Sequence, residues 1–228
     1  MSKFIIQGGK ELAGEVRISG SKNAALPIIA ATVLVKGKIT LYNVPNIQDV
    51  QTMFEIIRDI GGKVTKKNNK MIIDTSKINT YEIPENLMRK MRSSVILAGA
   101  IIGKYNKANF SYPGGCEIGS RPIDLHLKGF EKLGINIKEE YGEIICNAEK
   151  IEGTQIHLDF PSVGATENII LAACLAEGTT ILTNAAKEPE IEDMVIHQNK
   201  ENLYTKFMEI PEKPDALICS NDELAILL

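Results

Sequence analysis

The feature that most constrains the fold of this chain is an internal repeat. Residues 61–74 and 134–147 follow one plan, 73 positions apart: a glycine, a short β-branched run, a polar turn and a second apolar run. Such a pattern is typical of a β-hairpin. An amphipathic helix is predicted before each hairpin, over about 47–60 and 122–133, because apolar residues recur there at helical spacing. Repetition of one supersecondary unit predicts similar units that share a core.

A second offset, of 141 residues, relates the beginning of the chain to its later part. Apolar, alanine-rich segments at about 24–35 and 166–176 each end near a glycine and precede a β-rich run, and 93–102 is the middle copy. We predict buried helices there, since helices often end at glycine. Each unit then reads strand, buried helix, strand, amphipathic helix, hairpin. The sequence therefore predicts an inside-out α/β domain of three βαβαββ repeats, with helices inside, sheets outside and the third repeat incomplete.

The incomplete third repeat sets the predicted domain boundaries. After Asp193 an amphipathic helix and a hairpin should follow, but residues 194–202 are polar and lack a helical period. Residues 214–225 predict a strand, a turn and a capped helix, and weakly resemble a segment of sugar-responsive repressors. The predicted divisions are a strand segment at 1–20, a domain at 21–193 with repeats at about 21–80, 81–150 and 151–193, and a tail at 194–228.

Composition excludes several classes of partner. The 228 residues carry a net charge of −3, so no basic field favours nucleic acid. The N-terminus has no apolar signal-peptide core, and the longest apolar stretch, 24–35, is too short to span a bilayer. No cysteine lies in a CxxC pair, and no histidine has metal-ligand spacing. We expect a cytoplasmic protein with free thiols, without a metal, and with neither nucleic acid nor membrane as partner.

A glycine-rich loop at 112–122 is the first candidate for chemistry. It places Cys116 five residues before Arg121 and near a predicted helix start. Positive charge and a helix N-terminus both lower the pKa of a thiol and raise its reactivity. The alternative interpretation is a small buried cysteine and an ordinary surface arginine.

Three further candidates lie at corresponding places, the starts of the buried helices. Lys22 and Asn23 begin the first, Arg92 lies in a basic cluster before the second, and the small residues of 162–166 begin the third. Helix starts favour anions, and backbone N–H groups of small residues suit a diphosphate. The alternatives are simple N-caps, a solvated basic cluster and a tight turn. Their equivalence in the repeats predicts anion sites that converge at one end of the domain.

Four motifs in this order closely resemble the UDP-N-acetylglucosamine 1-carboxyvinyltransferases, enolpyruvyl transferases of the EPSP synthase-like family. The motifs are Ser21–Pro27, Pro113–Gly119, Arg121–His126 and Ser162–Thr166, and the likeness runs from Met1 to about Asp193. The resemblance implies transfer of enolpyruvyl from phosphoenolpyruvate to the 3-hydroxyl of UDP-N-acetylglucosamine, the first step of peptidoglycan synthesis. It implies a role in cell-wall biogenesis, cell shape and cell division, and no metal or organic cofactor.

The resemblance also implies roles for individual residues. Lys22 and Arg121 would bind phosphoenolpyruvate, with Asn23 beside them. Cys116 would protonate the C3 methylene of phosphoenolpyruvate and would be the thiol that fosfomycin alkylates. The residues that would contact the UDP-sugar are Arg92, Asp124, Leu125, Ser162, Val163 and Gly164. Immediately before the motif Ser162–Thr166, some relatives have a basic residue, whereas this chain has Phe160-Pro161.

Members of this family have two similar domains, with the active site between them and the first residues joined to the second domain. The 228 residues contain no such second domain. The resemblance therefore predicts little or no turnover by this chain alone. One alternative is an inactive half-enzyme that binds the UDP-sugar weakly. A second is a sugar-responsive regulator, although the sequence shows no helix-turn-helix pattern.

Overall fold

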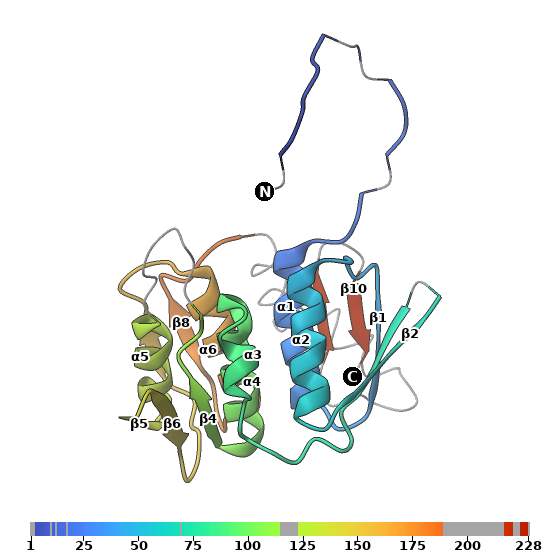
Figure 1. Ribbon diagram of the computed structural model, residues 1–228. Helices are drawn as coiled ribbons and strands as arrows, with labels where there is room; N and C mark the ends of the chain where they lie inside the picture. Colours follow the sequence, from blue (N-terminus) through green and yellow to red (C-terminus); the bar gives the residue numbers. More distant parts are fainter. Residues whose placement is uncertain are drawn as a thin grey trace, which may run out of the picture.

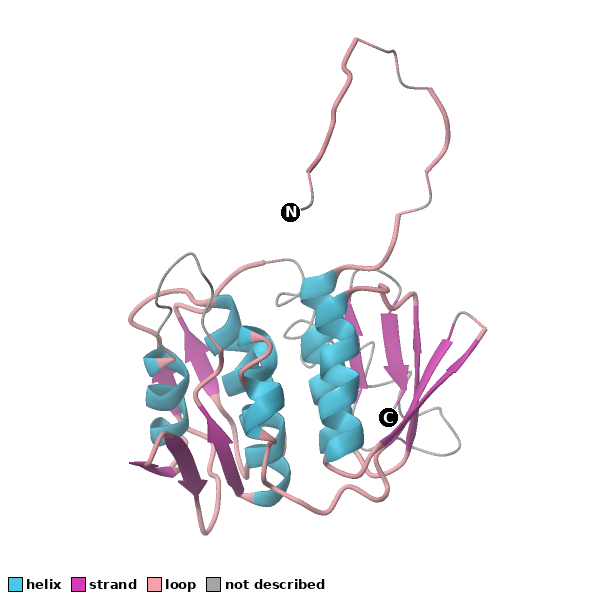
Figure 2. Cartoon of the chain, viewed as in Figure 1, coloured by secondary structure: helices cyan, strands magenta, loops and turns pink. Residues whose placement is uncertain are grey.

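Three repeated units fold around a central group of helices, with sheets outside them (Figure 1, Figure 2). The computed structural model describes residues 3–9, 11, 13–16, 18–68, 70–114 and 123–188, and the backbone of 217–220 and 224–227. The helices are α1 (Lys22–Ala31), η1 (Thr32–Leu34), α2 (Gln48–Asp59), α3 (Glu85–Met88), η2 (Arg92–Val95), α4 (Ile96–Tyr105), α5 (Asp124–Lys132) and α6 (Val163–Ala173). The strands of the first two units are β1 (Lys38–Tyr42), β2 (Lys63–Lys67), β3 (Lys70–Asp74), β4 (Lys107–Ser111), β5 (Asn136–Glu140) and β6 (Glu143–Asn147). The remaining strands are β7 (Gln155–His157), β8 (Ile181–Thr183), β9 (Leu217–Ser220) and β10 (Leu224–Leu227).

The three inner helices α1, α4 and α6 contact one another and form the centre of the core. Every residue from Ala24 to Ala31 in α1 and from Ile96 to Gly103 in α4 is buried. Helices that are apolar on all sides belong inside a protein. The prediction of inner helices is thereby confirmed, and with it the inside-out arrangement.

The outer layer repeats one strand order. The sheets β1-β3-β2 and β4-β6-β5 are both antiparallel, and their registers correspond: Ile39 pairs with Ile73, as Ala108 pairs with Cys146. The third unit contributes the parallel pair β7-β8. Alternate strand residues point into the core, as the buried side chains of Ile39 and Leu41 in β1 show.

The tail differs from its sequence prediction. The prediction of a capped helix within 214–225 is wrong. β9 and β10 instead form an antiparallel hairpin in which Leu224 pairs with Ser220. β10 lies beside β1 (Figure 1). An apolar run of four residues is too short to nucleate a stable helix, whereas strand pairing satisfies its backbone groups.

The described residues before α1 extend away from the domain without forming a strand (Figure 1). Phe4, Ile5 and Ile6 are 96%, 84% and 88% exposed. A strand needs a neighbour to hydrogen-bond, and none of the described residues pairs with this segment. None of the helices in the described part of the chain has the length and apolar character needed to cross a bilayer.

Candidate functional site

The N-terminal ends of α1, α4, α5 and α6 lie at one end of the molecule, uppermost in Figure 1. This end carries Lys22, the first residue of α1, and Arg92, which begins η2 just before α4. It also carries Val163, the first residue of α6. The unpaired N–H groups of helix starts give such a surface a positive potential. The helix starts that the repeat makes equivalent therefore lie at the same end of the domain.

Lys22 is held at this end by a capped helix and an ion pair. The Ser21 hydroxyl oxygen accepts a hydrogen bond from the N–H of Ala24 at 3.3 Å and so caps α1. Nζ of Lys22 lies 3.0 Å from Oδ2 of Asp49, in the first turn of α2. Because the Lys22 side chain is 52% exposed, an anionic ligand could replace Asp49 at little cost. Asn23 follows and is exposed.

His126 is the buried ionisable group of the site. It lies in α5 with only 5% of its surface exposed. Burial, and secondly the nearby positive charge of Arg92, lower the pKa of His126 to about 4, against the opposing effect of Asp124. The imidazole is therefore neutral at physiological pH. The half-buried Arg92 and the exposed Asp124 both lie close to this ring.

Asn168 ties three helices together beneath the site. Its Oδ1 accepts a hydrogen bond from the N–H of Gly99 at 2.7 Å, and its Nδ2 donates to the carbonyl of Val95 at 2.9 Å. These two backbone partners fix the orientation of the amide. Nδ2 also lies 2.9 Å from Nδ1 of His126, which must therefore accept. The imidazole proton is assigned to Nε2.

The starts of α5 and α6 touch. The Ser162 hydroxyl accepts a hydrogen bond from the N–H of Ala165 at 3.4 Å and caps α6. A β-carbon at Gly164 would lie 3.4 Å from Cε1 of His126, an ordinary van der Waals distance, so the first turn of α6 packs directly beside this ring. The structure thus brings Asp124 and the half-buried Leu125, which begin α5, to the residues 162–164.

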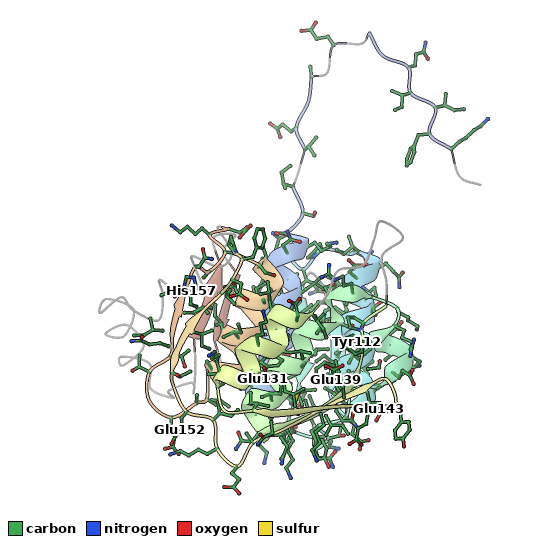
Figure 3. The ribbon with its side chains drawn as sticks, turned by 90° about the vertical axis from the view of Figure 1, so that its left-hand side faces the viewer. Tyr112, Glu131, Glu139, Glu143, Glu152 and His157 are labelled. Atoms are coloured by element: carbon green, nitrogen blue, oxygen red, sulfur yellow. The ribbon has the colours of Figure 1, made fainter. Side chains whose placement is uncertain are left out.

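Cys116 and Arg121 fall outside the described residues, but the segment leading to them is anchored. The N–H of Gly114 donates to the carbonyl of Met88 at 3.2 Å. The hydroxyl of Tyr112 donates to Oε2 of Glu139 at 2.6 Å (Figure 3). This hydrogen bond and partial burial raise the pKa of Tyr112 to about 12. The loop therefore leaves the sheet from a fixed point.

Sequence reasoning missed Gly99, Glu167 and Asn168. Glu167 and Asn168 are 6% and 0% exposed in the middle of the apolar α6. A polar pair inside an alanine-rich buried helix was the available signal, because buried polar groups require partners. The spacing of the histidines argues against a metal site and does not reveal the buried contact of His126. Among the described residues, no group of His, Cys, Asp and Glu is arranged to hold a metal ion.

Residues 6–199 match the family described as EPSP synthase (3-phosphoshikimate 1-carboxyvinyltransferase). The chain belongs to this family of carboxyvinyl transferases. It is 55% identical over 194 residues to UDP-N-acetylglucosamine 1-carboxyvinyltransferase 2 of Caldanaerobacter subterraneus subsp. tengcongensis, covering 85% of this chain and 46% of that protein. It is 51% identical over 202 residues to UDP-N-acetylglucosamine 1-carboxyvinyltransferase 1 of Clostridium acetobutylicum, covering 88% and 48%.

Solved structures share the fold. The enolpyruvyl transferase NikO from Streptomyces tendae superposes with a TM-score of 0.71 at 20% identity, over 96% of this chain and 49% of that one. EPSP synthase from Acinetobacter baumannii gives a TM-score of 0.63 at 16% identity, over 94% and 47%. The chain spans about half the length of the curated relatives it matches.

Proposed function

We propose that this chain is the first half of an enzyme that transfers enolpyruvyl from phosphoenolpyruvate to the 3-hydroxyl of UDP-N-acetylglucosamine. The observation that carries the proposal is the gathering of helix starts bearing Lys22, Arg92 and Val163 at one end of the domain. Both substrates are anions, which such an end attracts. Relatives with 55% and 51% identity are named for this reaction.

The proposed chemistry needs one acid and several anion-binding groups. A proton adds to C3 of phosphoenolpyruvate, and the sugar oxygen bonds to C2 as its hydroxyl proton leaves. The C2–O bond to phosphate then breaks, C3 loses a proton, and the enolpyruvyl ether and phosphate result. Protonation builds positive charge at C2, so the acid must be poised beside the bound anion. Cys116 is assigned as that acid and as the thiol that fosfomycin would alkylate.

Lys22 and Arg121 are assigned to phosphoenolpyruvate, with Asn23 beside them. Two observations support the place of Lys22: it begins a capped helix, and its ammonium partner among the described residues is a partly exposed carboxylate, Asp49. An incoming phosphate would compete with Asp49 for the same N–H donors. The binding energy of phosphoenolpyruvate would therefore include the loss of this ion pair.

The UDP-sugar is assigned to the neighbouring helix starts. The first N–H groups of α6 point out of the helix end and suit a diphosphate. The close approach of Gly164 to His126 supports a shared surface between α5 and α6. The residues assigned to this surface are Arg92, Asp124, Leu125, Ser162, Val163 and Gly164. The exposed Phe160 precedes them, and no anion contact is assigned to it.

A role in peptidoglycan synthesis, and through it in cell-wall biogenesis, cell shape and cell division, follows from this reaction. A cytoplasmic location belongs to the same proposal, since a reducing compartment keeps Cys116 a free thiol. The exposed Phe4, Ile5 and Ile6 suit a segment that pairs with a second domain. We assign no metal or organic cofactor to the reaction.

A second candidate function is UDP-sugar binding without turnover. It concerns the 228 residues taken alone, which match 46% of the relative's length. In this case the groups that activate the sugar hydroxyl lie on the part of the relatives that this chain does not match. The transferase would release phosphate from phosphoenolpyruvate, whereas the binding module would not.

Calorimetric titration of the chain with UDP-N-acetylglucosamine tests both. We expect weak binding that falls at least tenfold in Arg92→Ala and is retained in Arg58→Ala, a matched control at the far end of α2. Absent binding, or equal loss in both variants, would contradict the assigned surface. Phosphate release in a mixture of phosphoenolpyruvate and UDP-N-acetylglucosamine decides between the candidates. A rate that is lost in Cys116→Ala supports the transferase. A rate that is the same in the unaltered chain and in Cys116→Ala supports the binding module.

A further inference from the structure

A second concave surface lies at the end of α4 opposite to the candidate site. It is a pocket of about 630 Å³. The lining residues are Lys36, Ser76, Lys77, Ile78, Asn79, Lys104 and Tyr105. Lys104 is in the last turn of α4, whereas Arg92 precedes its first turn. At about 1.5 Å per residue the two ends are roughly 18 Å apart, so this pocket is separate from the candidate site.

From this pocket we infer a second anion-binding site, one that takes a compact polyanion of the phosphate or pyrophosphate class. Among the described residues that line it, three are lysines and none is acidic. In the described part of the chain, neither Lys36 nor Lys77 forms an ion pair with a carboxylate. Like charges gathered around a concave surface focus the field and raise the local concentration of anions.

The nearest acidic side chain along the loop, that of Asp74, is not in the lining of the pocket but is hydrogen-bonded to Ser76, which is. Oδ1 of Asp74 accepts hydrogen bonds from the N–H of Ser76 at 3.1 Å and from its hydroxyl at 2.6 Å. The charge of Asp74 also interacts with Lys38 and Lys63 on the sheet. The charge of Asp74 is thus balanced in part by two lysines outside the pocket, and the three lysines of the lining outnumber this one neighbouring carboxylate.

Lys104 is fixed in the floor of the pocket. Its half-buried ammonium donates to the carbonyls of Val33 at 2.6 Å and Val35 at 3.2 Å. The Val35 carbonyl also accepts from the Thr75 hydroxyl at 2.6 Å, which ties the floor to the loop. An ammonium has three N–H donors, and these carbonyls take two of them; Nζ also lies 5.7 Å from the centre of the Tyr105 ring, which itself lines the pocket. Burial, and secondarily the charge of Lys36, lower the pKa of Lys104, and a bound anion would relieve both effects.

The walls of the pocket are held by a separate contact. The Tyr105 hydroxyl donates to the carbonyl of Ile78 at 2.8 Å, so the loop is fastened to α4 beside Lys104. A purely structural role for Lys104, as a cation at a helix C-terminus, accounts for its two carbonyl contacts. It does not account for Lys36 and Lys77, which are exposed and flank the same concavity.

The test is a titration of the chain with inorganic pyrophosphate at constant ionic strength, followed by NMR of backbone amides and lysine side chains. A Lys22→Ala background weakens anion binding at the other end. We expect shifts at 76–79 and at Lys104, a rise in the pKa of Lys104, and affinity at least tenfold weaker after Lys36→Gln with Lys77→Gln. Lys36 and Lys77 are exposed, so this double variant leaves the core undisturbed. It tests the site even where the half-buried substitution Lys104→Met does not fold.

The matched control is Lys66→Gln with Lys67→Gln, two exposed lysines on β2 outside the pocket. This pair should leave the affinity unchanged. Equal weakening by both pairs would show a general charge effect and would overturn the site. Saturating pyrophosphate without a response at Lys104 would do the same. The outcome is independent of UDP-N-acetylglucosamine binding, so the two proposals can fail separately.

Discussion

Nδ2 of Asn168 lies 2.9 Å from Nδ1 of His126, and this buried contact joins α6 to α5 beneath the candidate site. The same amide also binds the backbone around α4 through Val95 and Gly99. One side chain therefore satisfies polar groups from three segments that are far apart in sequence. A buried network of this kind is stabilising only when every member is paired.

Asn168→Leu is expected to destabilise the chain by about 3–5 kcal/mol, since it leaves three buried polar groups without partners at about 1–3 kcal/mol each. Urea unfolding followed by circular dichroism measures the loss. Asn136→Leu, at the exposed start of β5, is the control and should change the free energy of unfolding by less than about 0.5 kcal/mol. A loss below about 1 kcal/mol in Asn168→Leu would show that the network contributes little.

Two helical glycines should respond differently to alanine. A β-carbon at Gly99 would lie 2.2 Å from the carbonyl oxygen of Asn168, and one at Gly129 would lie 2.2 Å from Cδ1 of Ile169. The same β-carbon at Gly129 would lie 2.5 Å from Cγ1 of the buried Ile169, so this side chain must repack, whereas at Gly99 the backbone of α6 would have to move. Alanine gains about 1 kcal/mol of helix propensity at both sites. We expect a loss of about 3 kcal/mol or more for Gly99→Ala and a smaller loss, of about 1–2 kcal/mol, for Gly129→Ala. Equal losses in urea unfolding would contradict this packing.

The sequence predicted the repeated elements well because their signals are local. β1 begins at Lys38 and ends at Tyr42, as the β-rich run indicates, and α2 lies within the predicted 47–60. Hydrophobic periodicity depends only on neighbours in sequence. The equivalence of Lys22, Arg92 and Val163 was likewise visible, because a repeat places corresponding residues at corresponding ends.

Long-range partners could not be predicted in this way. Asp49 is 27 residues from Lys22, and Asn168 is 42 from His126. Which polar groups meet depends on how the helices pack, not on local pattern. The tail hairpin was also missed, because a four-residue apolar run such as 224–227 fits helix or strand until its partner is known.

The Lys22–Asp49 pair gives a prediction about binding rather than stability. Because both side chains are partly exposed, Asp49→Asn should lower the free energy of unfolding by less than about 1 kcal/mol. It should also strengthen binding of phosphoenolpyruvate severalfold, since the Lys22 ammonium loses its competitor. Asp59→Asn, at the exposed far end of α2, should leave the affinity unchanged. Weaker binding in Asp49→Asn would assign Asp49 a positioning role instead.

His126 should make stability depend on pH in the mildly acidic range. The unfolded chain binds a proton at this histidine near pH 6.5, but the folded chain does so only near its lowered pKa of about 4. Stability is therefore full above pH 6.5 and falls as the pH drops toward 4, by up to about 3 kcal/mol. Urea unfolding between pH 5 and 7 should show this slope, and His126→Gln should flatten it. His157→Gln removes an exposed imidazole and should preserve the slope; an unchanged slope in His126→Gln would contradict the assignment.

The cysteines should differ strongly in reactivity. Burial raises the pKa of Cys146 to about 12 and that of Cys174 to about 11. At pH 8 their thiolate fractions, and hence their alkylation rates, should be at least about 100-fold below those of an ordinary thiol. Iodoacetamide or fosfomycin followed by peptide mass spectrometry should modify Cys116 first if it is the proposed acid. Denatured chain, in which both Cys146 and Cys174 become reactive, and Cys116→Ser are the controls. If Cys146 in the native chain were labelled as fast as Cys116, the proposal that Cys116 is an activated thiol would be contradicted.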